Sequence, residues 1–291
     1  MRSIYIIPGY ILVLTGAFFL SWGGLLIREI ESANIWQILF WRAFFFSLTL
    51  IFFLFFRYKK QALYIIKKSG YPGIAYGFAM SLGFVAYIIA MTETTVANVL
   101  FIISSQTIWL AIFGYLFLKE KISLKTLYSI ILAMIGITVM IGGSLDTGSL
   151  KGNLVALYIP VNFAFLILLI RKFPKIDFVP ALLIAGFLSM VYGFVMSETI
   201  VVSLYDLLIV FLLGSFQHAF GFICITIGAR STPAVIVGLL MLTEALFGPF
   251  WVWLFLNEIP PISVFLGGGI IIIAVIFKTL EQKYSKSLKS I

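Results

Sequence analysis

One long apolar segment occurs twice in this chain, and the duplication constrains the fold more than any other feature. The first copy runs from Thr94 to Ser123 and the second from Thr232 to Pro261. Each holds about 24 mostly apolar residues and ends near an acid, Glu120 or Glu258. A helix of about 20 apolar residues crosses a bilayer. The repeat therefore predicts a membrane protein with two related halves, a pattern typical of transporters.

The composition excludes a soluble globular protein. Of the 291 residues, 62% are hydrophobic and 11% are charged, and a soluble domain of this size could not cover so much apolar surface. A lipid bilayer can solvate it. The only cysteine is Cys224 and the only histidine is His218, so an intramolecular disulfide is excluded and we expect neither a metal site nor a cofactor.

Ten apolar segments predict an all-α polytopic membrane protein with ten transmembrane helices. The first is interpreted as a retained span, because its apolar run is too long for a signal peptide. Five spans belong to residues 1–143, and five, with a short basic tail, to residues 144–291. The spans cover about 5–27, 34–56, 71–91, 95–118, 125–143, 153–170, 178–197, 206–228, 233–256 and 262–280.

The basic residues predict the orientation. With the N-terminus in the cytoplasm, seventeen Lys and Arg residues fall on the cytoplasmic side and two, Arg28 and Lys151, on the outer side. This asymmetry follows the positive-inside rule, so the net charge of +9 indicates membrane orientation and not nucleic-acid binding. Both termini are then cytoplasmic. Because each half has an odd number of spans, the two halves are predicted to be inverted repeats.

Polar side chains near the middle of the spans mark the predicted pathway. A charged group at that depth costs at least ~2.5–3.5 kcal/mol, so it persists where it meets water, a partner or a substrate. The candidates are Arg42 in span two, Asn98 and Gln106 in span four, Asn162 in span six, Gln217 and His218 in span eight, and Glu244 in span nine.

The repeat extends to one face of spans four and nine. A polar residue is followed by two aromatic residues at i+3 and i+7, which is the spacing of a single helical stripe. Two readings stay open: the stripes are facing walls of one substrate cavity, or their aromatics fill the core of the bundle. The stripes are Gln106, Trp109 and Phe113, and Glu244, Phe247 and Trp251.

The charged candidates also have more than one reading. Arg42 could bind a substrate carboxylate, pair with Glu244, or clamp backbone carbonyl groups. Glu244 could carry a proton, anchor an amine, or serve as the partner of Arg42. A lone buried histidine such as His218 is more often a hydrogen-bonded structural group than a coupling residue. We interpret Glu120 and Glu258 as structural, contacting neighbouring lysines or backbone amides.

Spans five and ten are almost wholly apolar, so we expect them to face lipid or another helix. The glycines at 267–269 allow close packing. A homodimer through these spans and a peripheral position in a monomer both remain open. Pro160 and Pro249 each remove a helix hydrogen bond and permit a kink in spans six and nine. No H-E-x-x-H, G-x-S-x-G or phosphate-binding motif occurs, so we do not expect an enzyme.

Several motifs together resemble the drug/metabolite transporter superfamily, EamA type. They are the Trp22-Gly23 pair, Arg42 within FWRAFF, and the segments LFLKEKIS and LFLNEI that close spans four and nine. The sequence departs from the family at Thr107 and Ala245, where proline is common. The resemblance implies a bacterial inner-membrane carrier that exports small metabolites such as amino acids. It also implies a central cavity formed by spans one to four and six to nine, which adds Trp22 to the candidate site.

We therefore expect a secondary-active or facilitative transporter whose partners are a small-molecule substrate and the lipid bilayer. The alternative is a non-transporting membrane scaffold or accessory subunit. A channel is a weaker reading, because no ring of like polar groups is visible in the sequence.

Overall fold

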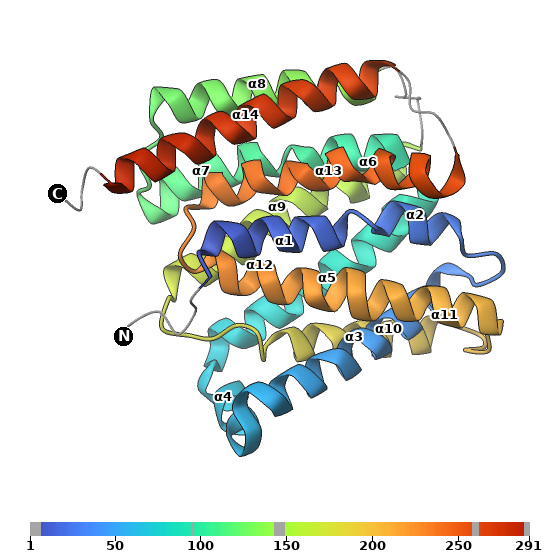
Figure 1. Ribbon diagram of the computed structural model, residues 1–291. Coiled ribbons are helices and arrows are strands. Elements are labelled where there is room, and N and C mark those ends of the chain that lie inside the picture. Colours follow the sequence, from blue (N-terminus) through green and yellow to red (C-terminus); the bar gives the residue numbers. More distant parts are fainter. Residues whose placement is uncertain (1–6, 95, 143–148, 258–261, 288–291) are drawn as a thin grey trace.

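A computed structural model describes residues 7–94, 96–142, 149–257 and 262–287. This part of the chain is built from helices and contains no strand (Figure 1). In order, the elements are α1 (Gly9–Leu20), α2 (Gly23–Arg28), α3 (Ile35–Tyr58), the 3₁₀ turn η1 (Lys59–Gln61), α4 (Ala62–Lys68), α5 (Gly70–Glu93), α6 (Val96–Ser104), α7 (Gln106–Leu118), α8 (Leu124–Gly142), α9 (Leu150–Lys172), α10 (Leu182–Met196), α11 (Leu204–Leu212), the π-helix η2 (Leu213–Phe220), α12 (Gly221–Ala229), α13 (Ala234–Leu256) and α14 (Ile262–Ser287).

The all-helical polytopic membrane architecture is confirmed. Seven helical segments in the described chain are long and apolar enough to cross a membrane, and they coincide with predicted spans one to four, six, eight and nine. Spans five, seven and ten fall on three shorter apolar helical stretches, Leu124–Val139, Leu182–Met196 and Ile262–Phe277. The number of membrane crossings, ten, remains a prediction.

Serines, not prolines, interrupt the predicted spans. Span one is broken between α1 and α2, where the Ser21 hydroxyl donates to the Phe18 carbonyl at 2.6 Å. Span four is broken at Ser105, whose hydroxyl donates to the Ile102 carbonyl at 2.6 Å. Such bonds compete with the helix ladder. In contrast, α9 and α13 continue through Pro160 and Pro249.

Predicted span eight consists of three joined pieces: α11, the π-helix η2 and α12. A π-helix forms i→i+5 hydrogen bonds, is rare, and occurs frequently at functional sites. Here it contains Gln217 and His218. Sequence periodicity could not reveal it, because the segment is apolar enough to form an ordinary helix.

The helix contacts repeat between the two parts of the chain. The shift of 138 residues carries α5 onto the α11–α12 region and α9 back onto the α1 region. The packing of α5 on α9 has its counterpart in α12 on α1, and that of α7 on α9 in α13 on α1. Three further packed pairs, α3 with α10, α7 with α13 and α8 with α14, each join equivalent helices.

Helices α1 and α12 meet backbone to backbone along a seam with two glycines on each side. A Cβ atom on Gly9 would lie 2.5 Å from the Gly228 carbonyl oxygen, and one on Gly16 would lie 2.7 Å from that of Gly221. In each helix the two glycines are seven residues apart, or about two turns. Any side chain at these positions would force the helices apart.

The pair α8–α14 lies at one edge of the bundle (Figure 1). A Cβ atom on Gly136 would lie 2.9 Å from the Gly267 carbonyl oxygen. Gly267 therefore serves packing within one chain. The predicted homodimer through these helices remains a prediction.

Two ends of the bundle can be distinguished. The start of α1, the ends of α7 and α9 and the start of α13 lie at the same end as α4, which we call the α4 end (Figure 1). The end of α5 and the start of α9 lie at the opposite end.

Candidate functional site: a central cavity between the repeats

A cavity lies at mid-height between α1, α5, α6, α7, α9, η2, α12 and α13. It encloses about 610 Å³ of empty space, counted together with its opening. Most of the lining side chains are apolar or aromatic. The amide, imidazole and carboxyl groups in the wall come from Gln106, Asn162, Gln217, His218 and Glu244.

Gln106 and Glu244, which are equivalent under the repeat, both line this cavity. Gln106 is the first residue of α7, directly after the break at Ser105, and Glu244 lies in the middle of α13. The structure therefore brings the polar heads of the two predicted stripes to one site.

The aromatic members of the stripes lie elsewhere. Trp109 and Phe113 contact each other, with ring centres 6.3 Å apart. Trp251 stacks on Trp22 at 4.3 Å and on Phe247 at 6.0 Å, and none of these five residues is part of the cavity lining. Trp22, Trp109 and Phe113 are partly buried and pack against the hydrophobic core.

Trp251 is anchored as well as stacked. Its indole N–H donates to the Ser21 hydroxyl at 2.8 Å. Since Ser21 is the residue at which α1 ends, the bond fixes α13 against the break in span one.

The Glu244 carboxylate faces the cavity. Among the described residues it forms neither a hydrogen bond nor an ion pair, although it faces a mostly apolar cavity. An unpaired acid in such surroundings is strongly unfavourable unless water, a proton or a cationic ligand accompanies it. The cavity is therefore suited to a group that can donate to a carboxylate.

Arg42 lies behind the cavity wall. It is 1% exposed and donates from Nη2 to the Phe84 carbonyl at 3.2 Å, which matches the predicted backbone clamp. Its guanidinium carbon is 5.6 Å from the centre of the Phe84 ring and 5.8 Å from that of Tyr87. Both rings line the cavity. No ion pair joins Arg42 to Glu244 within the described chain, so the predicted pairing is not present in this structure.

Two buried nitrogen atoms near the cavity have no hydrogen-bond partner among the described residues. One is Nη1 of Arg42 and the other is Nε2 of His218. The His218 ring packs edge-on against Phe84 at 4.2 Å, and its Nδ1 lies 3.3 Å from the side-chain oxygen of Gln217. Unsatisfied buried polar atoms are uncommon and call for a partner such as water or a ligand.

The amide side chains also hold the wall together. Asn162 donates to the Ala79 carbonyl at 2.9 Å and so joins α9 to α5. Gln217 donates to the Leu20 carbonyl at 3.1 Å and joins η2 to α1. These two bonds are at equivalent interfaces of the two repeats.

Asn98, like Arg42, is a polar candidate that does not line the cavity. It is bonded to Thr94 at 3.3 Å and to Asn153 at 3.4 Å, near the start of α6. Conversely, sequence reasoning missed Phe84 and Tyr87 of α5. Tyr87, a hydroxyl-bearing residue in the middle of an apolar span, was the available signal.

Comparison with known proteins places this geometry in a family. The sequence pattern of the EamA-like transporter family matches residues 7–142 and 148–280. An uncharacterized transporter of Clostridium kluyveri is 26% identical over 231 residues, which are 73% of this chain and 72% of that protein. A protein of known crystal structure shares the fold with a TM-score of 0.81 at 14% identity, over 94% of this chain and 97% of the other. The chain belongs to the EamA-like transporter family, as the sequence motifs predicted.

Proposed function

We propose that this membrane transporter carries small organic molecules bearing an amine, such as amino acids, through the central cavity. The carrier is secondary-active or facilitative and works as an exporter in a bacterial inner membrane, with both termini cytoplasmic. The observation that supports it most directly is the unpaired Glu244 carboxylate in a cavity lined by aromatic side chains. An ammonium group satisfies the carboxylate, and the aromatic rings favour a cation and an apolar body.

The mechanism is alternating access between two inverted five-helix halves, residues 1–143 and 144–291. The equivalent helix contacts and the two segments matched by the family pattern support this division. A site at the interface of two such halves is exposed first to one side and then to the other as the halves rock.

The role of Arg42 distinguishes a substrate that is a simple amine from one that is a zwitterion. A substrate carboxylate would satisfy the unpartnered Nη1 only after Phe84 or Tyr87 moves, because these rings separate Arg42 from the cavity. We therefore expect Glu244 to determine recognition in the present conformation. Arg42 would take part after the rings rearrange.

The test is uptake into proteoliposomes by wild type and Glu244→Gln. The probes are a zwitterionic amino acid, its decarboxylated amine and the corresponding neutral alcohol, which share one side chain. We expect Glu244→Gln, which keeps shape but loses charge, to lower the flux of both amine-bearing probes at least tenfold. A loss of one charge-assisted hydrogen bond, about 1.5–3 kcal/mol, accounts for a change of this size.

Glu93→Gln is the matched control, because Glu93 forms an exposed ion pair with Lys151 at 2.8 Å, away from the cavity. Full amine flux by Glu244→Gln would overturn the proposed recognition. No flux of any probe by wild type would instead favour the scaffold alternative. Loss of amino-acid flux alone in Arg42→Gln would show that the zwitterion is held at both ends.

A further inference from the structure

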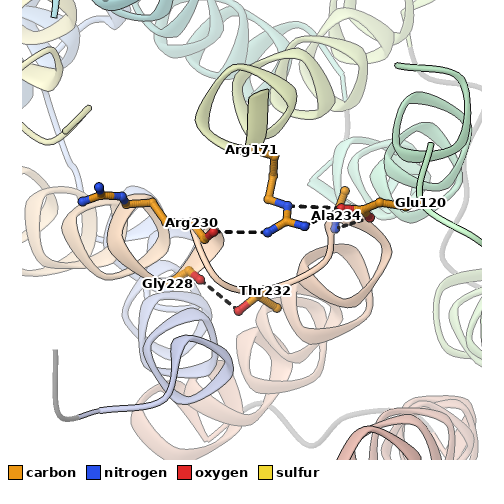
Figure 2. A network of polar contacts seen from close by, with 6 residues as sticks. All are labelled: Glu120, Arg171, Gly228, Arg230, Thr232 and Ala234. Carbon is orange, nitrogen blue, oxygen red and sulfur yellow. Dashed lines mark hydrogen bonds and ion pairs between the residues drawn. The ribbon is translucent and has the colours of Figure 1, made fainter. Parts of the chain in front are cut away.

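A polar network joins the ends of four helices at the α4 end of the bundle (Figure 2). Glu120, just past the end of α7, accepts from Arg171 Nε at 3.1 Å and Nη2 at 2.8 Å. Its other oxygen accepts from the Ala234 backbone N–H, the first of α13, at 2.9 Å. Arg171 Nη1 donates to the Arg230 carbonyl at 3.1 Å, which adds the end of α12.

The network extends across the same end of the molecule. Arg230 donates from Nη2 to the Pro174 carbonyl at 2.7 Å, and its Nη1 lies 3.9 Å from Asp177. Asp177 in turn accepts from the Tyr58 hydroxyl at the end of α3. The chain of contacts thus reaches from α7 to α3 through the loops at the α4 end.

The helices tied by the network are helices that line the cavity. Gln106 begins α7, whose 13 residues span about 20 Å before Glu120 is reached. Glu244 lies ten residues after Ala234 in α13, or about 15 Å away. Glu120 belongs to the first family-matched segment, whereas Arg171, Arg230 and Ala234 belong to the second. The network therefore joins one half of the chain to the other on the α4 side of the cavity.

The bonds between Glu120, Arg171 and the start of α13 are strong enough to hold these helix ends together, yet exposed enough to break and re-form. The Glu120 carboxylate lies at the N-terminus of α13, where free N–H groups and the helix dipole favour a negative charge. The Arg171 and Glu120 side chains are 24% and 16% exposed, so water reaches both. Partial exposure lowers the penalty for separating the charges, compared with a fully buried pair.

We propose that Glu120 and Arg171 form a latch that closes the α4 side of the cavity and releases when the transporter opens toward that side. The proposal rests on transport through the cavity, as proposed above. Opening requires Glu120 to leave the Ala234 N–H, which lets the end of α7 separate from the start of α13. Weakening the latch increases the population that is open on this side.

The first experiment measures access and needs no substrate. In a Cys224→Ser background, a cysteine replaces Gln106 and reacts with a membrane-impermeant maleimide added on one side. The relevant side is the one from which Lys68→Cys, on exposed α4, is labelled. We expect Glu120→Gln to raise the labelling rate at position 106 about tenfold, which corresponds to ~1.4 kcal/mol in the closed–open equilibrium. Gln at this position still offers the Ala234 N–H an acceptor.

Arg171→Gln should act like Glu120→Gln, whereas Lys172→Gln, which changes the adjacent exposed lysine, should leave the rate unchanged. Monodisperse elution of each variant in detergent checks folding. Equal labelling rates in wild type, Glu120→Gln and Arg171→Gln would overturn the latch and show a static tie.

The second experiment locks the latch. A Cβ atom on Gly114 would lie 3.5 Å from Cβ of Ala234, within the ~3.5–4.5 Å that a disulfide requires. Oxidised Gly114→Cys/Ala234→Cys should lose at least nine-tenths of its flux, and reductant should restore it. Each single variant controls for crowding beside Glu120. Undiminished flux in the locked protein would refute the latch. If the wild type transports no probe while Glu120→Gln and Arg171→Gln still raise the labelling rate at position 106, only the proposed function is refuted.

Discussion

Replacing Asp206 with Asn tests whether one buried carboxylate holds together the end of the bundle opposite α4. Asp206 lies in the first turn of α11 and is 0% exposed. One of its oxygens accepts from the Glu31 N–H at 2.9 Å. The other accepts from the Ser32 N–H at 3.1 Å, the Ser32 hydroxyl at 2.5 Å and the Ala33 N–H at 3.0 Å. The side chain thus organises the turn that precedes α3.

The magnitude follows from counting acceptors. Asn offers one oxygen where Asp206 offers two, so at least one part-buried N–H of the turn faces an NH₂ group instead. A stranded buried donor costs about 1–3 kcal/mol. The bonds that survive lose their charge assistance, about 1 kcal/mol in total. We expect Asp206→Asn to lower the free energy of unfolding by about 2–4 kcal/mol.

The assay is reversible unfolding with sodium dodecyl sulfate in mixed micelles, followed by tryptophan fluorescence. Glu29→Gln is the control, because it affects only an exposed hydrogen bond, which the Tyr205 hydroxyl donates to Glu29 at 2.8 Å. Substitutions at such sites usually change stability by less than about 0.5 kcal/mol. An Asp206→Asn protein within that margin of wild type would show that water or another donor arrangement replaces the lost acceptor, and the reasoning would fail.

Two further predictions concern packing and topology. Gly214→Ala places a Cβ atom 2.5 Å from the Arg42 carbonyl oxygen, so we expect the free energy of unfolding to fall by about 1–3 kcal/mol in the same assay. Gly24→Ala is the control and should be neutral or stabilising, because its Cβ would have no atom within 4 Å. Equal effects of the two substitutions would contradict the close approach at Gly214. Cysteines introduced at the exposed residues Lys68 and Lys151 should react with impermeant reagents from opposite faces, Lys68 from the cytoplasm. Labelling of both from one face would refute the predicted topology.

The sequence predicted the helical segments well because burial in lipid imposes a length that hydropathy reveals. The breaks within these helices are harder to predict from the sequence. The sequence predicts a continuous helix across Ser21 and across Ser105, yet the structure has breaks at both residues, whereas α9 and α13 continue through Pro160 and Pro249. A serine bonds either to solvent or back to its own helix, and only tertiary packing decides between these states.

The candidate site was predicted in part, for a related reason. Span counting placed Gln106 and Glu244 at one depth, and the repeat placed them on equivalent faces. It could not predict which way Arg42 extends, because a long side chain reaches a backbone carbonyl and a carboxylate at similar depth equally well. Glu120 shows the same limit: a backbone amide partner was expected and found, but its cation is Arg171, 51 residues away in sequence, and not a neighbouring lysine.

The glycine seam between α1 and α12 holds a helix of residues 1–143 directly against a helix of residues 144–291. Backbone contact at Gly9 and Gly16 leaves no layer of side chains that could slide or repack between the two helices. In the rocking motion proposed above, α1 therefore moves together with α12, although the two helices lie far apart in the sequence. The moving bodies of the proposed mechanism therefore do not coincide with the two sequence halves at α1. A protein assembled from two separately expressed halves must therefore re-form the α1–α12 interface before it can transport.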